Sequence, residues 1–131
     1  MSQDNVEVIR RPYDAFDTDL DALLRLLDPA IEWISPSDSL EPGHRHGHEG
    51  VKDAFAATRM AWDHPSHAPQ EFADAGDKVL VTVTFRGHGR GSGMEVERTE
   101  FHVWTVQSGA IVRFEWFYQR QEALEVVGLS E

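Results

Sequence analysis

Apolar positions in the first sixty residues recur at the spacing of α-helices. Three stripes predict three helices, beginning near residue 4, near residue 18 and after Gly50, of which the first two form a hairpin. Pro12 lies inside the first stripe, where the missing backbone donor predicts a kink or a restart. Two prolines within residues 63–69 predict that the third helix is followed by a loop. The stripes consist of Val6, Ile9, Tyr13 and Phe16, then Leu20, Leu23, Leu24 and Leu27, then Val51, Ala54, Phe55, Thr58 and Trp62.

From residue 71 onward the apolar period changes to two, which predicts strands. Long strands are expected in residues 77–87, 95–106 and 110–120, and a shorter one earlier, in residues 31–35. Residues 107–109 have the composition of a tight hairpin turn, and a final short helix over residues 121–127 should end at Gly128.

The two faces of the predicted strands differ in chemistry. The apolar face holds Val81, Val83, Phe85, His102, Trp104, Val106, Val112, Phe114, Trp116 and Tyr118. The opposite face holds Thr82, Thr84, Arg86, Thr105, Arg113 and Glu115, with Val103 and Phe117 among them. Helices followed by an antiparallel sheet with one apolar face predict an α+β fold, in which the sheet curves around the N-terminal helices as one domain over residues 1–131.

Composition excludes several classes of function. The chain has no cysteine, so thiolate metal sites and cysteine nucleophiles are excluded. A formal charge of −11 disfavours nucleic acid and anionic lipid as partners. No segment has the length and hydrophobicity of a signal peptide or a membrane span, so we expect a cytoplasmic protein that does not bind membranes.

Several stretches together resemble the SnoaL-like polyketide cyclase branch of the nuclear-transport-factor-2-like superfamily. They are "YDAFDTDLDALLRLLDPAIEW" near the start, "HGHEGVKDAF" before the third helix, "DAGDKVLVTVTFRGHGRGSG" in the middle and "FHVWTVQSGAIVRFEWF" near the end. The resemblance implies a cone-shaped α+β barrel with a pocket between helices and sheet. Members of the superfamily include cyclases, ketosteroid-isomerase-like enzymes, epoxide hydrolases and proteins without catalysis, so the fold alone does not set the activity.

The resemblance also implies where catalytic groups of the family would lie. The carboxylate base of isomerase-like members falls on Ser35, and their first-helix tyrosine falls on Pro12 or Tyr13. Their oxyanion-hole acid aligns best with His102, and the last-strand aspartate of cyclases and epoxide hydrolases falls on Trp116. The usual proton-transfer carboxylate is therefore missing at both positions.

His102 and Glu100 are the candidate catalytic residues because they share the inward face of one strand. His102 would act as a general acid or base, or as a hydrogen-bond donor to a bound carbonyl; alternatively it is a structural histidine. Glu100 would be a general base whose pKa is raised by desolvation among tryptophans; alternatively it forms a structural pair with Arg98 or His102.

Aromatic side chains are expected to line a pocket for a small hydrophobic molecule, although aromatics at strand spacing also form solid cores. The candidate ligand-binding residues are Tyr13, Phe16, Trp33, Ser35, His46, Phe55, Trp104, Phe114, Trp116 and Tyr118. His46 is included because the resemblance implies that its loop reaches the mouth of the pocket.

Three histidines at alternate positions, His44, His46 and His48, raise the possibility of a metal site. Their spacing is not the i, i+4 spacing of helical metal ligands, and three neighbouring glycines indicate a flexible loop. An exposed loop is therefore the preferred interpretation, and no metal or other cofactor is expected. His64 and His67, in the proline-rich segment, receive no role.

Two functions remain open. One is an acid–base isomerase, cyclase or hydratase that acts on a small hydrophobic carbonyl compound without a cofactor; the other is a non-catalytic binding or assembly module that uses the same pocket. The second, partly apolar sheet face and the family resemblance predict a homodimer through that face, with a monomer as the alternative.

Overall fold

The computed structural model describes residues 2–37, 39 and 43–128, so part of the predicted domain over residues 1–131 lies outside the described residues. Three helices precede most of the sheet: α1 (Ser2–Ala15), α2 (Leu20–Leu26) and α3 (Gly47–Ala61). The strands are β1 (Leu27–Ser35), β2 (Gly43–His46), β3 (Trp62–Ala75), β4 (Lys78–Gly89), β5 (Glu95–Gln107) and β6 (Ala110–Phe117), and the helix α4 (Arg120–Val127) follows them. The predicted α+β fold is confirmed.

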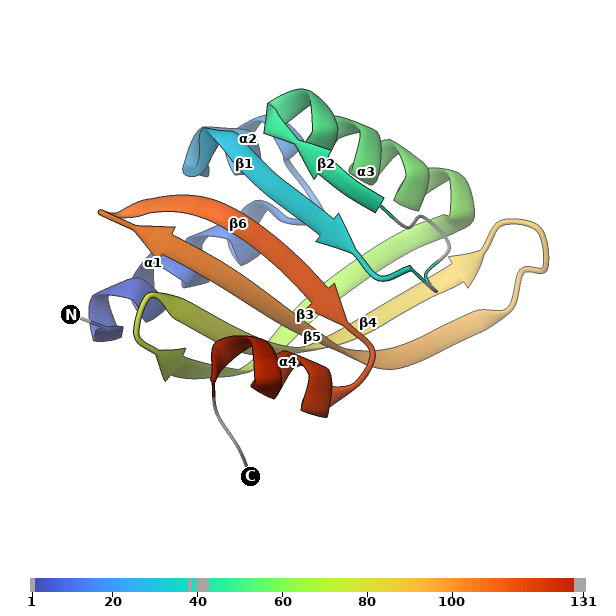
Figure 1. The fold of residues 1–131 in the computed structure, drawn as a ribbon. Coiled ribbons are helices and arrows are strands. Elements are labelled where there is room, and N and C mark those ends of the chain that lie inside the picture. The colour runs from blue at the N-terminus through green and yellow to red at the C-terminus, as the bar shows by residue number, and fades with distance from the viewer. Residues whose placement is uncertain (1, 38, 40–42, 129–131) are drawn as a thin grey trace.

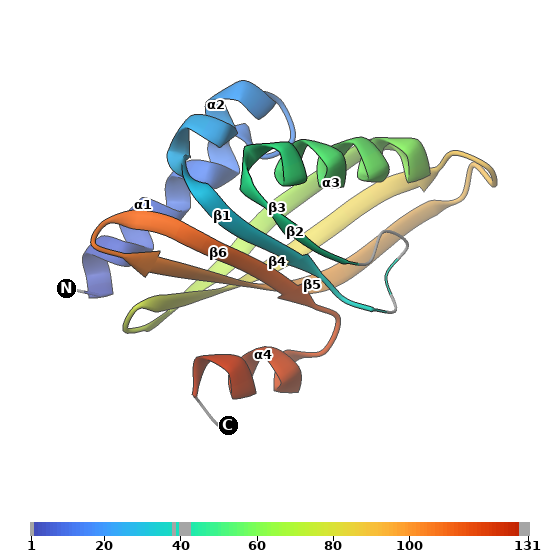
Figure 2. The same ribbon diagram turned by 45° about the horizontal axis from the view of Figure 1, so that its top comes forward.

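The strands form one curved sheet in the order β2-β1-β6-β5-β4-β3. Only the β1–β6 pair is parallel among the described strands. The helices α1, α2 and α3 lie on the inner face of the sheet, whereas α4 lies on the opposite face (Figures 1 and 2). The space between the sheet and the first three helices holds the larger core, which includes the predicted inward residues Val81, Val83, Trp104 and Phe114.

The helix α1 continues through Pro12 without the predicted restart. The helix α2 begins after Asp19, whose side chain accepts a hydrogen bond from the backbone N–H of Ala22 at 3.0 Å. The helix α3 begins at Gly47, four residues before the predicted start at Val51.

The loop predicted for residues 63–69 is wrong, because these residues belong to β3. Prolines are tolerated there because β3 is an edge strand, where one side of the backbone needs no ladder donor. The register with β4 shifts between Asp63 and Ser66 and again between Pro69 and Glu71. Pro65 and Pro69 both lie at these irregularities.

The exposed loop predicted around the histidine run is partly wrong, because residues 43–46 form the second edge strand, β2. The prediction for Val112 is also wrong. A register shift next to Thr105 and Val106 makes Ile111 the buried partner of Val106, and Val112 lines a groove on the outer face instead.

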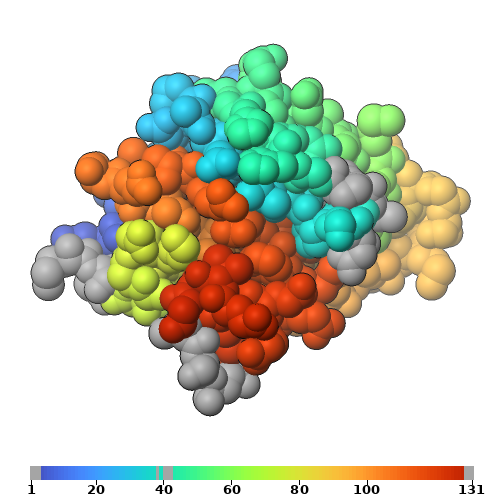
Figure 3. All heavy atoms as spheres, in the orientation of Figure 1, coloured from blue at the N-terminus to red at the C-terminus, as the bar shows by residue number. Residues whose placement is uncertain are grey.

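The outer face, which the sequence predicts as a dimer interface, is partly covered within the chain itself. The helix α4 packs against it through Ala123 and Leu124, which bury Leu80 and Val103 and contact Phe117. The space-filling view shows α4 covering the middle of this face (Figure 3). Two of the apolar residues that suggested a dimer interface are therefore covered within the chain, Val103 completely and Phe117 in part.

Candidate functional site

A cavity of about 50 Å³ opens between the inner sheet face, the turn that follows α1 and the helix α3. It is much smaller than the several hundred Å³ typical of small-molecule sites, so a ligand of that size needs side chains to move. Its apolar wall consists of Phe16, Trp33, Ala54, Phe55, Trp62, Phe85, Phe114 and Trp116. Its polar wall consists of Asp17, Ser35, Thr58, Arg59, His67, Arg98, Glu100 and His102. Pro65 also lines the cavity.

The structure separates the predicted ligand-binding residues into three groups. Phe16, Trp33, Ser35, Phe55, Phe114 and Trp116 line the cavity, as do both predicted catalytic residues. Tyr13, Trp104 and Tyr118 lie behind the lining and support it. His46 is exposed on β2 at a register position opposite Glu32, on the outer face, so the expectation that it reaches the mouth of the pocket is wrong.

Glu100 is the centre of the polar wall and is 2% exposed. One carboxylate oxygen accepts hydrogen bonds from Nε and Nη2 of Arg98, at 3.1 and 2.8 Å. The other oxygen lies 2.9 Å from Nε2 of His102 and 3.8 Å from Nε2 of His67. The carboxylate is therefore fully surrounded by donors and positive charge.

The predicted rise in the pKa of Glu100 is wrong. Desolvation alone would raise this pKa, but the hydrogen bond from His102 and the charges of His102, His67 and Arg98 outweigh it and lower the pKa to about 2. Glu100 is thus ionised at neutral pH and too weak a base to be poised there. It acts as a fixed negative charge.

His102 is 1% exposed and both of its ring nitrogens are engaged. Burial lowers its pKa, against the opposing hydrogen bond and charge of Glu100, so the ring is neutral at pH 7. Since Nε2 donates to the Glu100 carboxylate, Nδ1 accepts from the hydroxyl of Tyr13 at 2.7 Å. Tyr13 in turn accepts from Nε1 of Trp104 at 2.9 Å. No nitrogen of His102 is left for a ligand in this arrangement.

Burial raises the pKa of Tyr13 well above its usual value; the hydrogen bond from Trp104 opposes this rise, and the charge of Glu100 adds to it. The hydroxyl therefore stays protonated and keeps its role as the donor to His102. Tyr13 thereby links α1 to the sheet across 89 residues of sequence.

His67 is the functional candidate that the sequence pattern missed. Its Nδ1 lies 2.7 Å from Oδ1 of Asp17, and its backbone N–H donates to Oδ2 of the same carboxylate at 2.6 Å. Because a carboxylate only accepts, Nδ1 carries a proton, and any lone pair that the ring offers is on Nε2. The ring packs between Phe16 and Phe85 and lines the cavity. The only sequence signal was a histidine between two prolines, at a place where the pattern indicated a loop.

The guanidinium of Arg98 belongs to the polar wall and lies over aromatic rings of the apolar wall. Its guanidinium carbon lies 4.5 Å from the ring centre of Phe85 and 5.4 Å from that of Trp116. Trp116 also donates from Nε1 to the hydroxyl of Ser35 at 3.2 Å. The two positions where the family carboxylates would lie are thus joined in a neutral hydrogen bond.

The curved open sheet, the helices on its inner face and the buried polar wall between them define a class of protein: a small α+β domain with a cavity on the inside of the sheet. Residues 9–114 match the family model of the SnoaL-like domain. The chain therefore belongs to the SnoaL-like domain family. No curated protein matches its sequence.

Solved structures agree with this assignment. The chain is 27% identical to TerC, which was co-crystallised with polyporic acid, with coverage of 95% of this chain and 98% of that one and a TM-score of 0.79. It is 28% identical to a nuclear-transport-factor-2-like protein from Burkholderia thailandensis, with coverage of 91% and 95% and a TM-score of 0.81. A SnoaL-like polyketide cyclase from Jannaschia shares only 18% identity at a TM-score of 0.77, over 99% of this chain and 95% of that one, and therefore shows likeness of fold alone.

Within the described residues, no helix is both long enough and apolar enough to cross a bilayer.

Proposed function

We propose that this protein is a cofactor-independent acid–base enzyme, of the isomerase, cyclase or hydratase type, that acts on a small, flat, hydrophobic carbonyl compound. The observation that carries the proposal is the pair formed by Asp17 and His67 at the wall of an aromatic cavity. An imidazole whose Nδ1 proton is held by a carboxylate presents its other nitrogen in a fixed orientation, which suits it to proton transfer.

The roles of the polar residues follow from their contacts. His67 transfers the proton at Nε2, and Asp17 orients its ring. Glu100, ionised and 3.8 Å from that nitrogen, stabilises the imidazolium formed after proton abstraction. His102 positions Glu100 rather than touching the ligand. The proposal moves the proton-transfer role, which the sequence suggested for His102, onto His67.

The apolar wall selects the ligand. Phe16, Trp33, Phe55 and Phe114 present ring faces and edges, and such walls favour flat apolar molecules. Phe55 is only partly buried, so its movement would enlarge the cavity for a ring-sized ligand. The co-crystallisation of TerC with polyporic acid supports small-molecule binding in a relative.

The test uses 2-tetralone, a small aromatic ketone, as the probe. Exchange of its α-protons in D₂O is followed by NMR, and binding is followed by quenching of tryptophan fluorescence. We expect the protein to accelerate exchange and His67→Ala to reduce this acceleration at least tenfold, while His64→Ala, an exposed histidine of the same strand, leaves it unchanged. Equal acceleration by His67→Ala and the unchanged protein would overturn the assignment of His67.

The second candidate function is a non-catalytic binding module. It is favoured by the neutral Ser35–Trp116 contact at the positions of the family carboxylates. Quenching by 2-tetralone or polyporic acid without any acceleration of exchange would support this function instead of the enzyme.

We also propose a homodimer through the part of the outer face that α4 leaves uncovered. This part is a groove lined by Glu32, Val112, Arg113 and Glu115, with alternating charges that a two-fold copy could match. The buried hydroxyl of Thr105, which lines the same groove, has no hydrogen-bond partner among the described residues. Sedimentation at the monomer mass of 14.8 kDa would refute the dimer, and Val112→Arg should dissociate it.

A further inference from the structure

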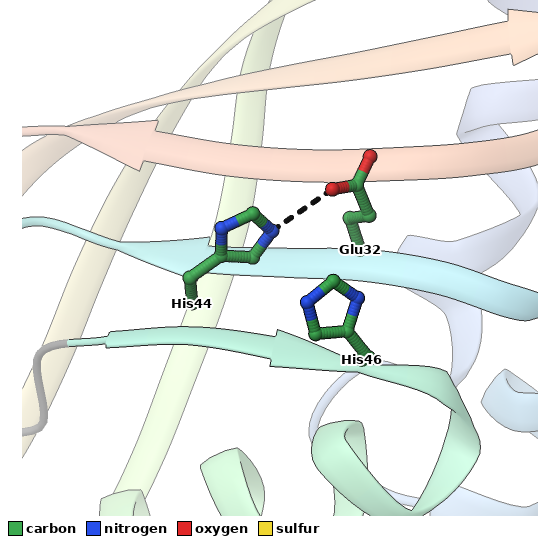
Figure 4. Close-up of side chains that lie close together, drawn as sticks. All are labelled: Glu32, His44 and His46. Atoms are coloured by element: carbon green, nitrogen blue, oxygen red, sulfur yellow. Dashed lines mark hydrogen bonds and ion pairs between the residues drawn. The ribbon is translucent and has the colours of Figure 1, made fainter.

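Glu32, His44 and His46 form a cluster on the outer face of the β1–β2 edge, away from the cavity (Figure 4). Glu32 and His46 are register partners, and His44 lies two residues before His46, so all three side chains point to the same side of the sheet. The imidazole rings of His44 and His46 stack with their centres 4.7 Å apart. Nε2 of His44 lies 2.9 Å from Oε1 of Glu32.

One ligand atom from each of these residues lies within 4.8 Å of the other two. Around a tetrahedral zinc ion, neighbouring ligand atoms are about 3.3 Å apart, because each lies about 2.0 Å from the metal. Small rotations of exposed side chains are enough to reach that geometry, since the paired strands already hold the three Cα positions. Two imidazoles and one carboxylate form a ligand set that favours zinc and other late divalent metals over magnesium and calcium.

We propose that Glu32, His44 and His46 bind one divalent zinc-class ion, with water in the fourth position. This replaces the expectation that the histidine run binds no metal, which rested on a flexible glycine-broken loop. The run is instead a paired strand through His46, and pairing fixes the alternation that brings His44 and His46 together. The third histidine is not a ligand, because Nε2 of His48 lies 3.0 Å from the backbone carbonyl of Leu27.

Neighbouring charges orient the carboxylate. Nη1 of Arg113 lies 3.2 Å from Oε2 of Glu32, which leaves Oε1 for the metal. Nε of Arg113 also contacts Glu115 at 3.1 Å, so the two carboxylates outweigh the guanidinium and the site keeps a net negative charge.

The test is calorimetric titration of untagged, chelator-treated protein with ZnCl₂, with native mass spectrometry for stoichiometry. We expect one zinc per chain, and at least tenfold weaker binding in each of His44→Ala, His46→Ala and Glu32→Gln. The matched control is His88→Ala, because His88 is also an exposed strand histidine near a glutamate, Glu95 at 3.9 Å, but within the described part of the chain it belongs to no cluster of three metal-ligating side chains. Its zinc affinity should equal that of the unchanged protein.

Cobalt substitution gives a second readout. Co²⁺ bound by two imidazoles and a carboxylate should show the intense visible absorption of tetrahedral coordination, and His46→Ala should lose it. Circular dichroism checks that each variant keeps its fold. The proposal is overturned if His46→Ala binds zinc as tightly as the unchanged protein, or if the loss occurs in His67→Ala instead, which would place the metal in the cavity.

Discussion

Asp17 and His67 meet through two hydrogen bonds, one from the backbone N–H of His67 and one from its ring, although 50 residues separate them in the sequence. Asp17 belongs to the turn between α1 and α2, whereas His67 belongs to the edge strand β3. The carboxylate therefore fixes both the position of the strand and the tautomer of the ring. The contact thereby helps to hold Nε2 of His67 3.8 Å from Oε1 of Glu100.

Asp17→Asn should remove the fixed orientation of the His67 ring while leaving the fold intact. An amide can present either its oxygen or its NH₂ group to Nδ1 of His67, so the ring loses its enforced tautomer while the volume is kept. We expect 2-tetralone exchange to fall at least tenfold with little change in binding of the ketone. Asp14→Asn, an exposed aspartate near the end of α1, is the matched control. A loss of binding equal to the loss of exchange would indicate a merely structural role.

His102 should make the folded state sensitive to acid. Burial lowers the pKa of His102 in the folded protein below the value of 6.5 in the unfolded chain. As the pH falls below 6.5, the unfolded chain therefore binds a proton before the folded protein does, and the free energy of unfolding decreases. We expect the Tm of the unchanged protein to fall more steeply between pH 7 and pH 5 than that of His102→Gln. Parallel curves for the two proteins would show that His102 does not titrate with folding.

Glu100 should make the stability of the folded protein depend on pH in a more acidic range. Its folded pKa of about 2 lies below the value of about 4.3 in an unfolded chain, so its stabilisation is complete above about pH 4.5 and lost as pH falls toward 2. Glu100→Gln should flatten the Tm profile in that window. Glu97→Gln, on the same strand but exposed and paired with Arg86, should keep the original profile.

A side chain at Gly50 should destabilise the folded protein. A Cβ there would lie 2.9 Å from Cβ of Arg45 and 3.2 Å from its backbone carbonyl carbon, in the buried first turn of α3. We expect Gly50→Ala to lower the free energy of unfolding by about 1–3 kcal/mol, measured by urea denaturation. A Cβ at Gly91 meets nothing within 4 Å, so Gly91→Ala should be close to neutral.

Leu124 tests whether α4 is integral to the outer face. It is 4% exposed and packs in the cluster with Leu80 and Val103. Leu124→Ala should lower the free energy of unfolding by about 2–4 kcal/mol, and Glu125→Ala, an exposed neighbour, by much less. Equal effects would mean that the helix contributes little to the sheet.

The sequence by itself determined which strand residues face inward. His102, Trp104, Phe114 and Trp116 were all placed correctly, because side-chain alternation along a strand is a local property. The same holds for the helical hairpin and for the C-terminal helix, whose stop at Gly128 follows from a left-handed residue at φ 76°. Val112 was misplaced because a bulge interrupts the alternation and leaves no mark in composition.

Only the tertiary structure decided the chemistry of the site. Whether Glu100 is a base or a fixed charge depends on the balance between desolvation and three groups, of which His67 comes from a different strand. The identity of the proton-transfer candidate depends on Asp17, from a turn outside the sheet. The cover of the outer face by α4 and the cluster of Glu32 with His44 likewise join distant segments. Such contacts follow from how the elements pack, and local patterns along the chain carry no information about them.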